Sequence, residues 1–399
     1  MLEGVNVALG VTGSIAAVKT VELAHELRRR GATVRAVMTG SAQGIVHPWA
    51  LEFATESDVV TEITGRVEHV ELCGTDGWAD VFLIAPATAN TVGKIAGAVD
   101  DTPVTTCATT ALGADTPVVI APAMHEPMYD HPGVLEAIER IESWGVEFVE
   151  PRVEEGKAKI ATEEAIVCDV ARAAGERPLA DEHVVVTSGA TSEAIDPIRV
   201  LTNRSSGTMG RAVARACYVR GATVTLVHGV VGPHPIGRES SIPAGAPVPY
   251  AVVRQTESAA EMLDTTAEVC ATADALVSAA AIGDYTLEAS PEKIRSGQNL
   301  TLEFEPTPKL IDEIRDRHPD LPIVGFKAET SGDEEAMIEA ARETLERAEL
   351  TFVVANDASV MGEAETSALL VHANDAARYT GTKDGLAAEI AASLAVVLE

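Results

Sequence analysis

The chain has 399 residues, and its 30 Lys and Arg against 61 Asp and Glu give a formal net charge of −31 at pH 7. A charge of this size repels nucleic acids and anionic membranes, so the composition argues against both as partners. The hydrophobic content of 46% excludes intrinsic disorder, and an acidic surface over a normal core predicts adaptation to a salt-rich, halophilic cytoplasm.

The N-terminus predicts a cytoplasmic protein. Met1 to Gly4 lack the basic region of a signal peptide, and no apolar run reaches the roughly 18 residues of a transmembrane helix. The cysteines are odd in number, scattered and free of CxxC pairs, which disfavours disulfide scaffolds and zinc sites. They are Cys73, Cys107, Cys168, Cys217 and Cys270.

The length exceeds what one hydrophobic core usually organises, so we expect two domains. Residues 175–182 combine Gly, Pro and charge, follow an alanine-rich helical run and precede a fresh apolar strand. The predicted organisation is a first domain at 1–175, a linker at 176–182 and a second domain at 183–399.

In the first domain, apolar strands expected at 5–9, 33–37, 81–84 and 118–120 alternate with helices expected at 16–29 and 133–144. This alternation predicts an α/β fold with a doubly wound, mainly parallel sheet, in which ligands sit beyond the carboxyl ends of the strands. After the second strand, a dinucleotide site needs an acidic residue, but the chain has Thr39 and Ser41. Hydroxyl groups fit a terminal phosphate, so a mononucleotide such as FMN is favoured over NAD.

The second domain repeats the pattern, with strands expected at 184–187, 223–228, 275–278, 323–326 and 352–355. No P-loop motif occurs, yet the polar, glycine-containing stretch 203–210 opens a helix and predicts an anion cradle. Lysine is scarce in this chain, so Lys293, Lys309 and Lys327 near strand ends are functional candidates, with plain surface charge as the alternative for each. For Asp284 the alternative is a helix or turn cap.

Three segments of the first domain, 10–17, 85–91 and 122–129, resemble the flavin-containing phosphopantothenoylcysteine decarboxylases. The resemblance covers about 5–170 and implies a flavodoxin-like fold and FMN, which oxidises the substrate thiol so that the carboxylate leaves as CO2. It implies that His69 is the active-site histidine and that His125 meets the substrate carboxylate where the family usually has Asn. The implied cofactor-binding residues are Gly13, Ser14, Ile15, Thr39, Ser41, Thr88, Asn90, Thr105 and Met124.

One departure concerns the substrate flap of that family, which carries a cysteine acid in bacteria. The corresponding stretch 151–160 has none, which leaves Lys157 or Lys159 as possible proton donors, or as solvated flap residues. Cys168 lies beyond the flap on an expected helix and is assigned to the core.

Blocks at 203–207, 282–285, 291–294, 325–330 and 355–357 resemble, in order, the phosphopantothenate-cysteine ligases. The resemblance spans about 184–399 and implies a Rossmann-like domain that uses Mg2+ and a nucleoside triphosphate, usually CTP, to activate 4′-phosphopantothenate for attack by cysteine. Asn203 would hold the acyl nucleotidylate, and Lys293 would neutralise triphosphate charge. The implied nucleotide-binding residues are Ser278, Ala279, Ala280, Asp284, Lys293, Pro308, Lys309, Leu310, Ile311 and Phe326.

The ligase family tends to place two lysines on the helix before 355–357, and this chain has none there, so Arg342 or Arg347 would replace them. The whole chain thus resembles fused enzymes that join the two reactions in coenzyme A biosynthesis, and by this resemblance we expect a homo-oligomer. Two alternatives stay open: a ligase whose flavin-binding first half is inert, and a regulatory binding protein. The magnesium ligands and the choice of CTP over ATP stay unassigned.

Overall fold

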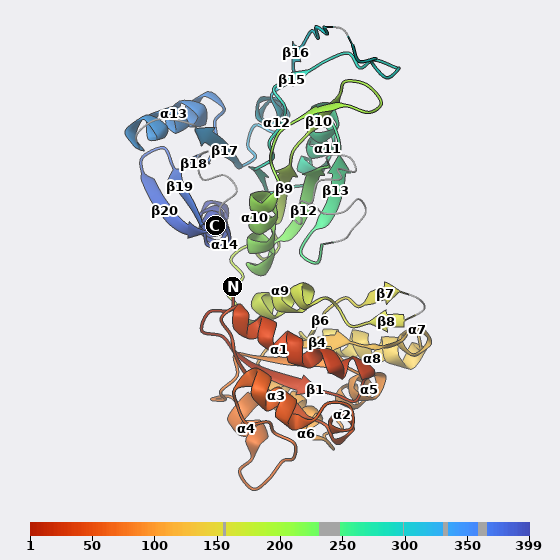
Figure 1. Cartoon of the computed structure of the whole chain (residues 1–399). Helices are drawn as coiled ribbons and strands as arrows, with labels where there is room; N and C mark the ends of the chain where they lie inside the picture. Colours follow the sequence, from red (N-terminus) through yellow and green to blue (C-terminus); the bar gives the residue numbers. More distant parts are fainter. Residues whose placement is uncertain (155–156, 231–247, 298, 330–333, 358–364) are drawn as a thin grey trace. The chain divides into compact units, whose positions relative to one another are not determined.

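The structure is a computed structural model that describes residues 1–154, 157–230, 248–297, 299–329, 334–357 and 365–399. Within these ranges, the side chains at 153–154, 157–158, 328–329, 357 and 365 are left undescribed. The chain forms two compact units, Met1–Gly175 and Glu176–Glu399, and each is treated separately below (Figure 1).

The first unit is built on a five-stranded sheet whose strands all run parallel. The spatial order β2-β1-β3-β4-β6 is that of flavodoxin-like folds, in which the ligand site lies where the order reverses, between β1 and β3. The strands are β1 (Asn6–Val11), β2 (Thr33–Met38), β3 (Val81–Ala87), β4 (Val118–Pro122) and β6 (Glu147–Phe148).

Helices cover both faces of this sheet, as expected for strands buried on both sides. One face carries α1 (Thr20–Arg29) and α9 (Glu163–Ala174), with α3 (Pro48–Thr55) packed on α1. The other carries α4 (Glu68–Cys73), α5 (Ala89–Ala96), α6 (Pro103–Gly113) and α8 (Pro132–Glu142). Shorter elements are η1 (Ile15–Lys19), α2 (Gly40–Gln43) and α7 (Glu126–Tyr129).

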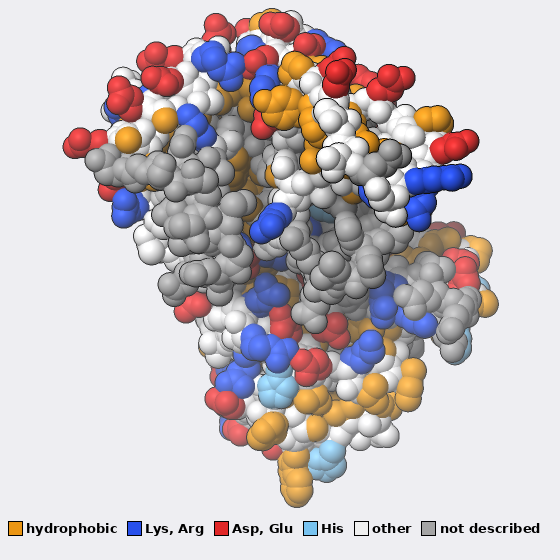
Figure 2. Space-filling model, turned by 45° about the horizontal axis from the view of Figure 1, so that its top comes forward, with side chains coloured by type: hydrophobic (Ala, Val, Ile, Leu, Met, Phe, Trp, Pro, Cys, Tyr) orange, Lys and Arg blue, Asp and Glu red, His pale blue; other side chains and the backbone are white. Residues whose placement is uncertain are grey.

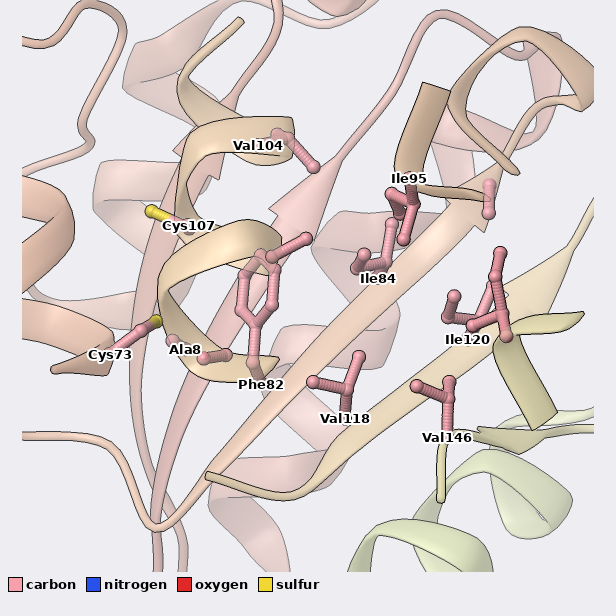
Figure 3. Close-up of a cluster of buried hydrophobic side chains, with 14 of the residues drawn as sticks. Ala8, Cys73, Phe82, Ile84, Ile95, Val104, Cys107, Val118, Ile120 and Val146 are labelled. Carbon is pink, nitrogen blue, oxygen red and sulfur yellow. The ribbon is translucent and has the colours of Figure 1, made fainter. Parts of the chain in front are cut away.

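Alternate residues of the strands point into the core under the second helical face. Phe82, Ile84, Val118 and Ile120 come from β3 and β4 and are buried among side chains of the four helices (Figure 3). Phe82 is one of the largest fully buried side chains of the chain. Burial of this kind supplies most of the favourable free energy of folding and fixes the sheet whose strand ends form the site.

A small antiparallel sheet stands beside the main one in the first unit. It is formed by β5 (Met124–His125), β7 (Arg152–Glu154) and β8 (Lys157–Lys159), in the order β5-β8-β7. The backbone pairs Met124 with Ala158 and His125 with Lys157. Within the predicted flap, β7 and β8 therefore pair with each other, and β8 pairs with the segment that follows β4.

The second unit contains an eight-stranded sheet in the order β13-β12-β9-β14-β17-β18-β19-β20. The first six of these strands run parallel, and the last two pairings are antiparallel. Its strands are β9 (His183–Gly189), β12 (Thr223–Gly229), β13 (Val252–Thr256), β14 (Ala275–Ser278), β17 (Ile323–Glu329), β18 (Phe352–Asp357), β19 (Glu365–Val371) and β20 (Ala376–Thr382).

The helices of the second unit are α10 (Thr208–Val219), α11 (Ala259–Cys270), α12 (Leu310–Arg317), α13 (Glu334–Arg347) and α14 (Lys383–Leu398). Side chains of α11, α12 and α13 bury one face of the sheet, around Val185, Leu276 and Val353. Two short antiparallel pairs complete the unit: β10 (Ser192–Ala194) with β11 (Val200–Thr202), and β15 (Tyr285–Thr286) with β16 (Glu305–Pro306).

The predicted α/β class with mainly parallel sheets is confirmed. The helix expected at 16–29 divides into the 3-10 turn η1 and α1, and the residues expected as a linker, 176–182, belong to the second compact unit. Leu179 is fully buried and its amide donates to the carbonyl of Arg220, so the segment packs as part of the second unit.

Among the described residues, each helix is too short or too polar to cross a membrane. On the face shown in Figure 2, Asp and Glu side chains are distributed among Lys, Arg and other residues. Cys168 is buried on α9, as predicted for a core residue.

Candidate functional site

The first unit has a cavity of about 480 Å3 at the carboxyl ends of β1, β3 and β4. This volume lies in the range of small-molecule and cofactor pockets. Its lining brings together six residues that were predicted for cofactor or substrate: Gly13, Ser14, Ile15, Thr88, Met124 and His125. The reversal of strand order between β1 and β3 explains why turns that are distant in sequence meet here.

Positive groups surround this cavity. Lys19, Arg152 and Lys159 belong to its lining together with His125, and none of the described lining residues is Asp or Glu. In a chain of net charge −31, such a local excess of cations favours an anionic ligand. Sequence reasoning missed Lys19 and Arg152, although the scarcity of lysine, applied to this domain as well, would have marked Lys19.

The turns that form the cavity are held by hydrogen bonds between strand ends. The Thr12 hydroxyl donates to the Pro86 carbonyl at 2.7 Å, and the Thr88 amide donates back to Thr12 Oγ1 at 3.2 Å. The Ser14 hydroxyl donates to the Ala123 carbonyl at 3.0 Å. The ends of β1, β3 and β4 are thereby fixed relative to one another.

The backbone at Gly13 lies so close to α2 that a side chain would not fit there. A Cβ built on Gly13 would lie 2.5 Å from Ser41 Oγ and 2.6 Å from Ser41 Cβ, which is closer than real atoms come. The chain therefore passes next to the N-terminus of α2 only because residue 13 lacks a side chain.

Four predicted cofactor residues lie outside the cavity lining. The Thr39 hydroxyl caps α2 by accepting from the Ala42 amide, and it lies 3.1 Å from the Ser41 hydroxyl. Thr105 is buried and its hydroxyl donates to the Thr102 carbonyl, within the capping box of α6. Asn90 is exposed in the first turn of α5. Hydroxyl residues near strand ends thus serve as helix caps, and the sequence pattern does not separate this use from contact with a ligand.

His125 and His69 have different positions. His125 is exposed, begins α7 without a side-chain capping bond and lines the cavity. His69 lies on α4 and is absent from that lining; its Nδ1 is buried and accepts or donates no hydrogen bond among the described residues. Beside it, Glu68 accepts hydrogen bonds from the hydroxyl and amide of Thr64, which lower the pKa of Glu68 to about 2. The start of α4 is therefore held by a permanent carboxylate.

The proton-donor candidates of the flap are only partly described. Lys159 lines the cavity. The side chain of Lys157 lies outside the described part of the structure.

In the second unit, the predicted anion cradle lies where α10 begins. Gly207 has φ +71° at the N-cap and gives α10 no side-chain capping bond, so the first amides of the helix are not capped by that residue. A Cβ on Gly210 would lie 2.7 Å from Ser188 Cβ, so the first turn of α10 packs directly on the end of β9. Two glycines thus allow this helix terminus to lie beside the strand ends.

The segment after β14, which includes the predicted nucleotide-binding residues Ala280 and Asp284, is held by hydroxyl groups. Thr187 Oγ1 accepts from the Ala280 amide at 3.2 Å, and Thr191 Oγ1 accepts from the Gly283 amide at 2.8 Å. The side-chain amide of Asn203 donates to the carbonyls of Ala281 and Ile282 at 3.1 and 3.2 Å. In the described structure the Asn203 amide therefore fixes this segment; its predicted contact with the acyl nucleotidylate stays a prediction.

The remaining predicted nucleotide contacts differ in accessibility. Lys309 Nζ lies 2.6 Å from Asp284 Oδ1, and both side chains are mostly exposed. Lys293 and Pro308 are exposed, Phe326 is half-buried, and Ser278 is buried at the end of β14. Leu310 is buried in the core, and Ile311 is partly buried and packs against it.

Other predicted basic groups have partners or are half-buried. Lys327 Nζ donates to the Ala340 carbonyl at 2.8 Å, and Arg347 Nη1 lies 2.9 Å from both carboxylate oxygens of Asp312. Arg342 is half-buried, and its Nε is buried with no hydrogen-bond partner among the described atoms. Thr330, which ends one of the sequence blocks, lies outside the described residues.

Comparison with known families matches both units. The flavoprotein family matches residues 1–175, and the family described as DNA/pantothenate metabolism flavoprotein C-terminal domain matches residues 179–397. The coenzyme A biosynthesis bifunctional protein CoaBC of Thermococcus kodakarensis is 49% identical over 374 residues, covering 93% of this chain and 89% of that protein. The chain belongs to the CoaBC family.

Other members of the CoaBC family are similar along most of the chain. Those of Methanocaldococcus jannaschii and Bacillus subtilis are each 35% identical and cover 90% and 91% of this chain, with 85% and 88% of their own lengths matched. Among solved structures, the FMN-dependent cysteine decarboxylase SpaF is 32% identical over 44% of this chain and 100% of its own, with a TM-score of 0.39. The predicted bifunctional enzyme of coenzyme A biosynthesis, with decarboxylase and ligase activities, is confirmed by the family.

Proposed function

We propose that the first unit binds FMN and decarboxylates 4′-phosphopantothenoylcysteine to 4′-phosphopantetheine. The observation that carries this proposal is the cationic cavity at the reversal point of a flavodoxin-ordered sheet, whose described lining contains no Asp or Glu. The cavity size, the close backbone approach at Gly13 and the donors around the turn suit a phosphorylated cofactor. When bound, the flavin accepts two electrons from the substrate thiol and later returns them.

The residues of this chain then have separate tasks. Arg152 and Lys19 supply fixed positive charge for phosphate and carboxylate groups. His125, exposed at the cavity, meets the substrate carboxylate, and Lys159 is the cavity residue placed to return a proton after CO2 leaves. The turn amides around Gly13 and Ser14 orient the anion.

The visible spectrum of the purified protein tests cofactor binding, and CO2 release from 4′-phosphopantothenoylcysteine tests the reaction. We expect a yellow protein that releases CO2, and a Lys159→Met variant that keeps its flavin but loses most of the turnover. A colourless protein would contradict flavin binding. A yellow protein without CO2 release would support an inert first half.

We infer further that the decarboxylase site is completed by a second copy of the chain, because His69 lies outside the cavity lining of its own unit. Ile15 lines the cavity and is 79% exposed, and Trp49 and Phe53 on α3 are 74% and 76% exposed. Hydrophobic side chains are visible on the surface of this unit, in the lower part of Figure 2. Such side chains favour coverage by another protein surface.

Co-expression of two inactive variants tests the shared site. If His69 acts in the site of a second copy, a mixture of His69→Asn and Lys159→Met chains regains activity, because some sites then contain neither substitution. No recovery in assemblies shown to be mixed would place both residues in one chain's site.

We propose that the second unit joins cysteine to 4′-phosphopantothenate with CTP and Mg2+, in the cytoplasm. The uncapped start of α10 and the neighbouring 280–284 segment support an anion site at the strand ends. Lys293 and Lys309 supply positive charge for the triphosphate, and Asn203 maintains the segment whose backbone lines the nucleotide base.

Asn203→Asp tests this assignment, because a carboxylate in place of the amide would face two carbonyl oxygens. We expect ligation to be abolished while decarboxylation of supplied substrate continues. Loss of both activities would contradict independent sites. Pyrophosphate release measured with CTP and with ATP would decide the nucleotide.

A further inference from the structure

The 285–294 segment connects Asp284 to Lys293, two of the predicted nucleotide contacts. None of its residues is buried; Tyr285, for example, is 55% exposed. Hydrophobic packing therefore does not decide where this segment lies. Its first two residues form β15 and pair with β16. The rest of the segment is held by polar contacts with residues 193–199, which sequence reasoning did not single out.

Asp196 makes the densest of these contacts. Its side chain has no exposed surface. Oδ1 accepts from the amides of Ile198 and Arg199 at 2.8 and 2.9 Å, and Oδ2 accepts from Arg199 Nη1 at 2.6 Å and from the Ile294 amide at 3.1 Å. The bond to Ile198 forms an Asx-turn around Pro197, which orients the carboxylate locally. The bond to Ile294 crosses 98 positions of sequence to the neighbour of Lys293.

Arg199 also binds Ile294. Its Nη1 also donates to the Ile294 carbonyl at 3.1 Å, so both backbone polar groups of Ile294 are held. Burial raises the pKa of Asp196, but hydrogen bonds from the Ile198, Ile294 and Arg199 amides, with the Arg199 charge, outweigh it and leave that pKa below its usual value. The acceptor is therefore a carboxylate at neutral pH.

Glu193 holds the other end of the segment. It is 8% exposed, and its two oxygens accept from the Ala259 amide and from the Thr286 hydroxyl, each at 2.8 Å. Between the two carboxylates, the Ser290 amide donates to the Ile195 carbonyl at 2.9 Å. The 285–294 segment is thus attached near both ends and in the middle.

We propose that Asp196, assisted by Arg199, is a positioning residue of the ligase that fixes Ile294 and so presents the ammonium group of Lys293 to the anionic phosphates of the nucleotide. The proposal rests on the proposed function of Lys293. Glu193 serves the Asp284 end of the same segment. A lysine on an exposed, unanchored segment would sample many positions, and even a displacement of about 1 Å can cost about 100-fold in rate.

A double-mutant cycle between Asp196 and Lys293, made in the full-length protein, tests this. Asp196→Asn keeps the size of the side chain but removes its charge and one acceptor, and we expect kcat/KM for CTP in ligation to fall about 10- to 100-fold. In a Lys293→Met background, the same substitution should have little further effect, because no ammonium group remains to be positioned. Decarboxylase activity and far-UV circular dichroism should stay unchanged, as should all activities of the control Glu288→Gln, an exposed residue of the same segment.

Arg199→Lys gives an independent reading, because its exposed side chain makes misfolding a small risk. It should lower kcat/KM for CTP and speed hydrogen exchange at the Ile294 amide. If Asp196→Asn and Lys293→Met reduce ligation additively, or if Arg199→Lys leaves ligation at the wild-type level, the positioning role is wrong although the ligase assignment stands. If Lys293→Met alone ligates at the wild-type rate, the proposed role of Lys293 is wrong, and the positioning proposal that rests on it is wrong as well.

Discussion

His228 gives the second unit a defined pH response. It lies near the end of β12, between β9 and β13, and is 2% exposed. Its Nδ1 is buried without a hydrogen-bond partner among the described residues. Burial, and next the charge of Arg211 on α10, lower the pKa of His228 from its ordinary 6.5 to about 4. Between pH 6.5 and about 4, the imidazole of His228 is therefore neutral in the folded protein but protonated in the unfolded chain.

The sign and size of the effect follow from proton linkage. The contribution of neutral His228 to the free energy of unfolding is fully present above pH 6.5. It decreases as the pH falls from 6.5 toward 4, and it is fully lost below about pH 4. Each pKa unit corresponds to about 1.36 kcal/mol, so the whole difference is about 3 kcal/mol, of which about 2 kcal/mol is lost by pH 5. His228→Phe keeps a planar ring and removes the titration.

Urea unfolding at pH 7.5 and pH 5 measures the difference. Samples equilibrated at each pH are given a short deuterium pulse at one common pH, and peptides from β9 and β12 report the unfolded fraction of this unit. The wild type should lose about 2 kcal/mol more than His228→Phe between the two pH values. Equal losses in the two proteins would refute the reasoning, because His228 would then titrate alike in the folded and unfolded states.

Two substitutions in the first unit test its core and its cavity. Phe82→Ala removes a fully buried ring and should lower the free energy of unfolding of this unit by about 3–5 kcal/mol. Urea unfolding followed by tryptophan fluorescence measures this, because all three tryptophans belong to this unit. A loss below about 1 kcal/mol would contradict the packing. Gly13→Ala places a Cβ about 2.5 Å from Ser41 Oγ, and the variant should fold but bind much less flavin. A full flavin content, measured by absorbance, would show that the turn can accommodate the Cβ without losing the cofactor.

The sequence predicted nine strands of the two main sheets, because parallel strands buried on both faces must be apolar along their length. It missed β6, which has two residues, the largely exposed edge strands β13 and β20, and β19. The expected strand at 275–278 coincides with β14, and most of the others differ by one to three residues at an end. Helix type was less certain: the expected helix at 16–29 begins as a 3-10 turn, whose different hydrogen-bond spacing leaves no clear mark in the hydrophobic pattern.

The candidate site was predictable only in part. Strand order brings Gly13, Ser14 and Thr88 to one cavity, and their small or hydroxyl side chains had indicated this role. Thr39 and Thr105 carry the same chemical signal but lie outside the cavity lining. Their hydroxyls serve helix ends, as do those of Ser14 and Thr88, so this use does not separate the two pairs. The type of a residue determines which hydrogen bonds its side chain can make, but the partner depends on the tertiary structure.

By itself the amino-acid sequence determined the class of fold, the division into two catalytic halves and the family, because apolar periodicity and motif order are local properties of the chain. Only the tertiary structure decided that Lys19 and Arg152 face the cavity, that His69 does not, and that Asp196 binds the amide of Ile294. Those contacts join residues far apart in sequence, and they depend on strand order and on the exact path of loops that no local pattern encodes.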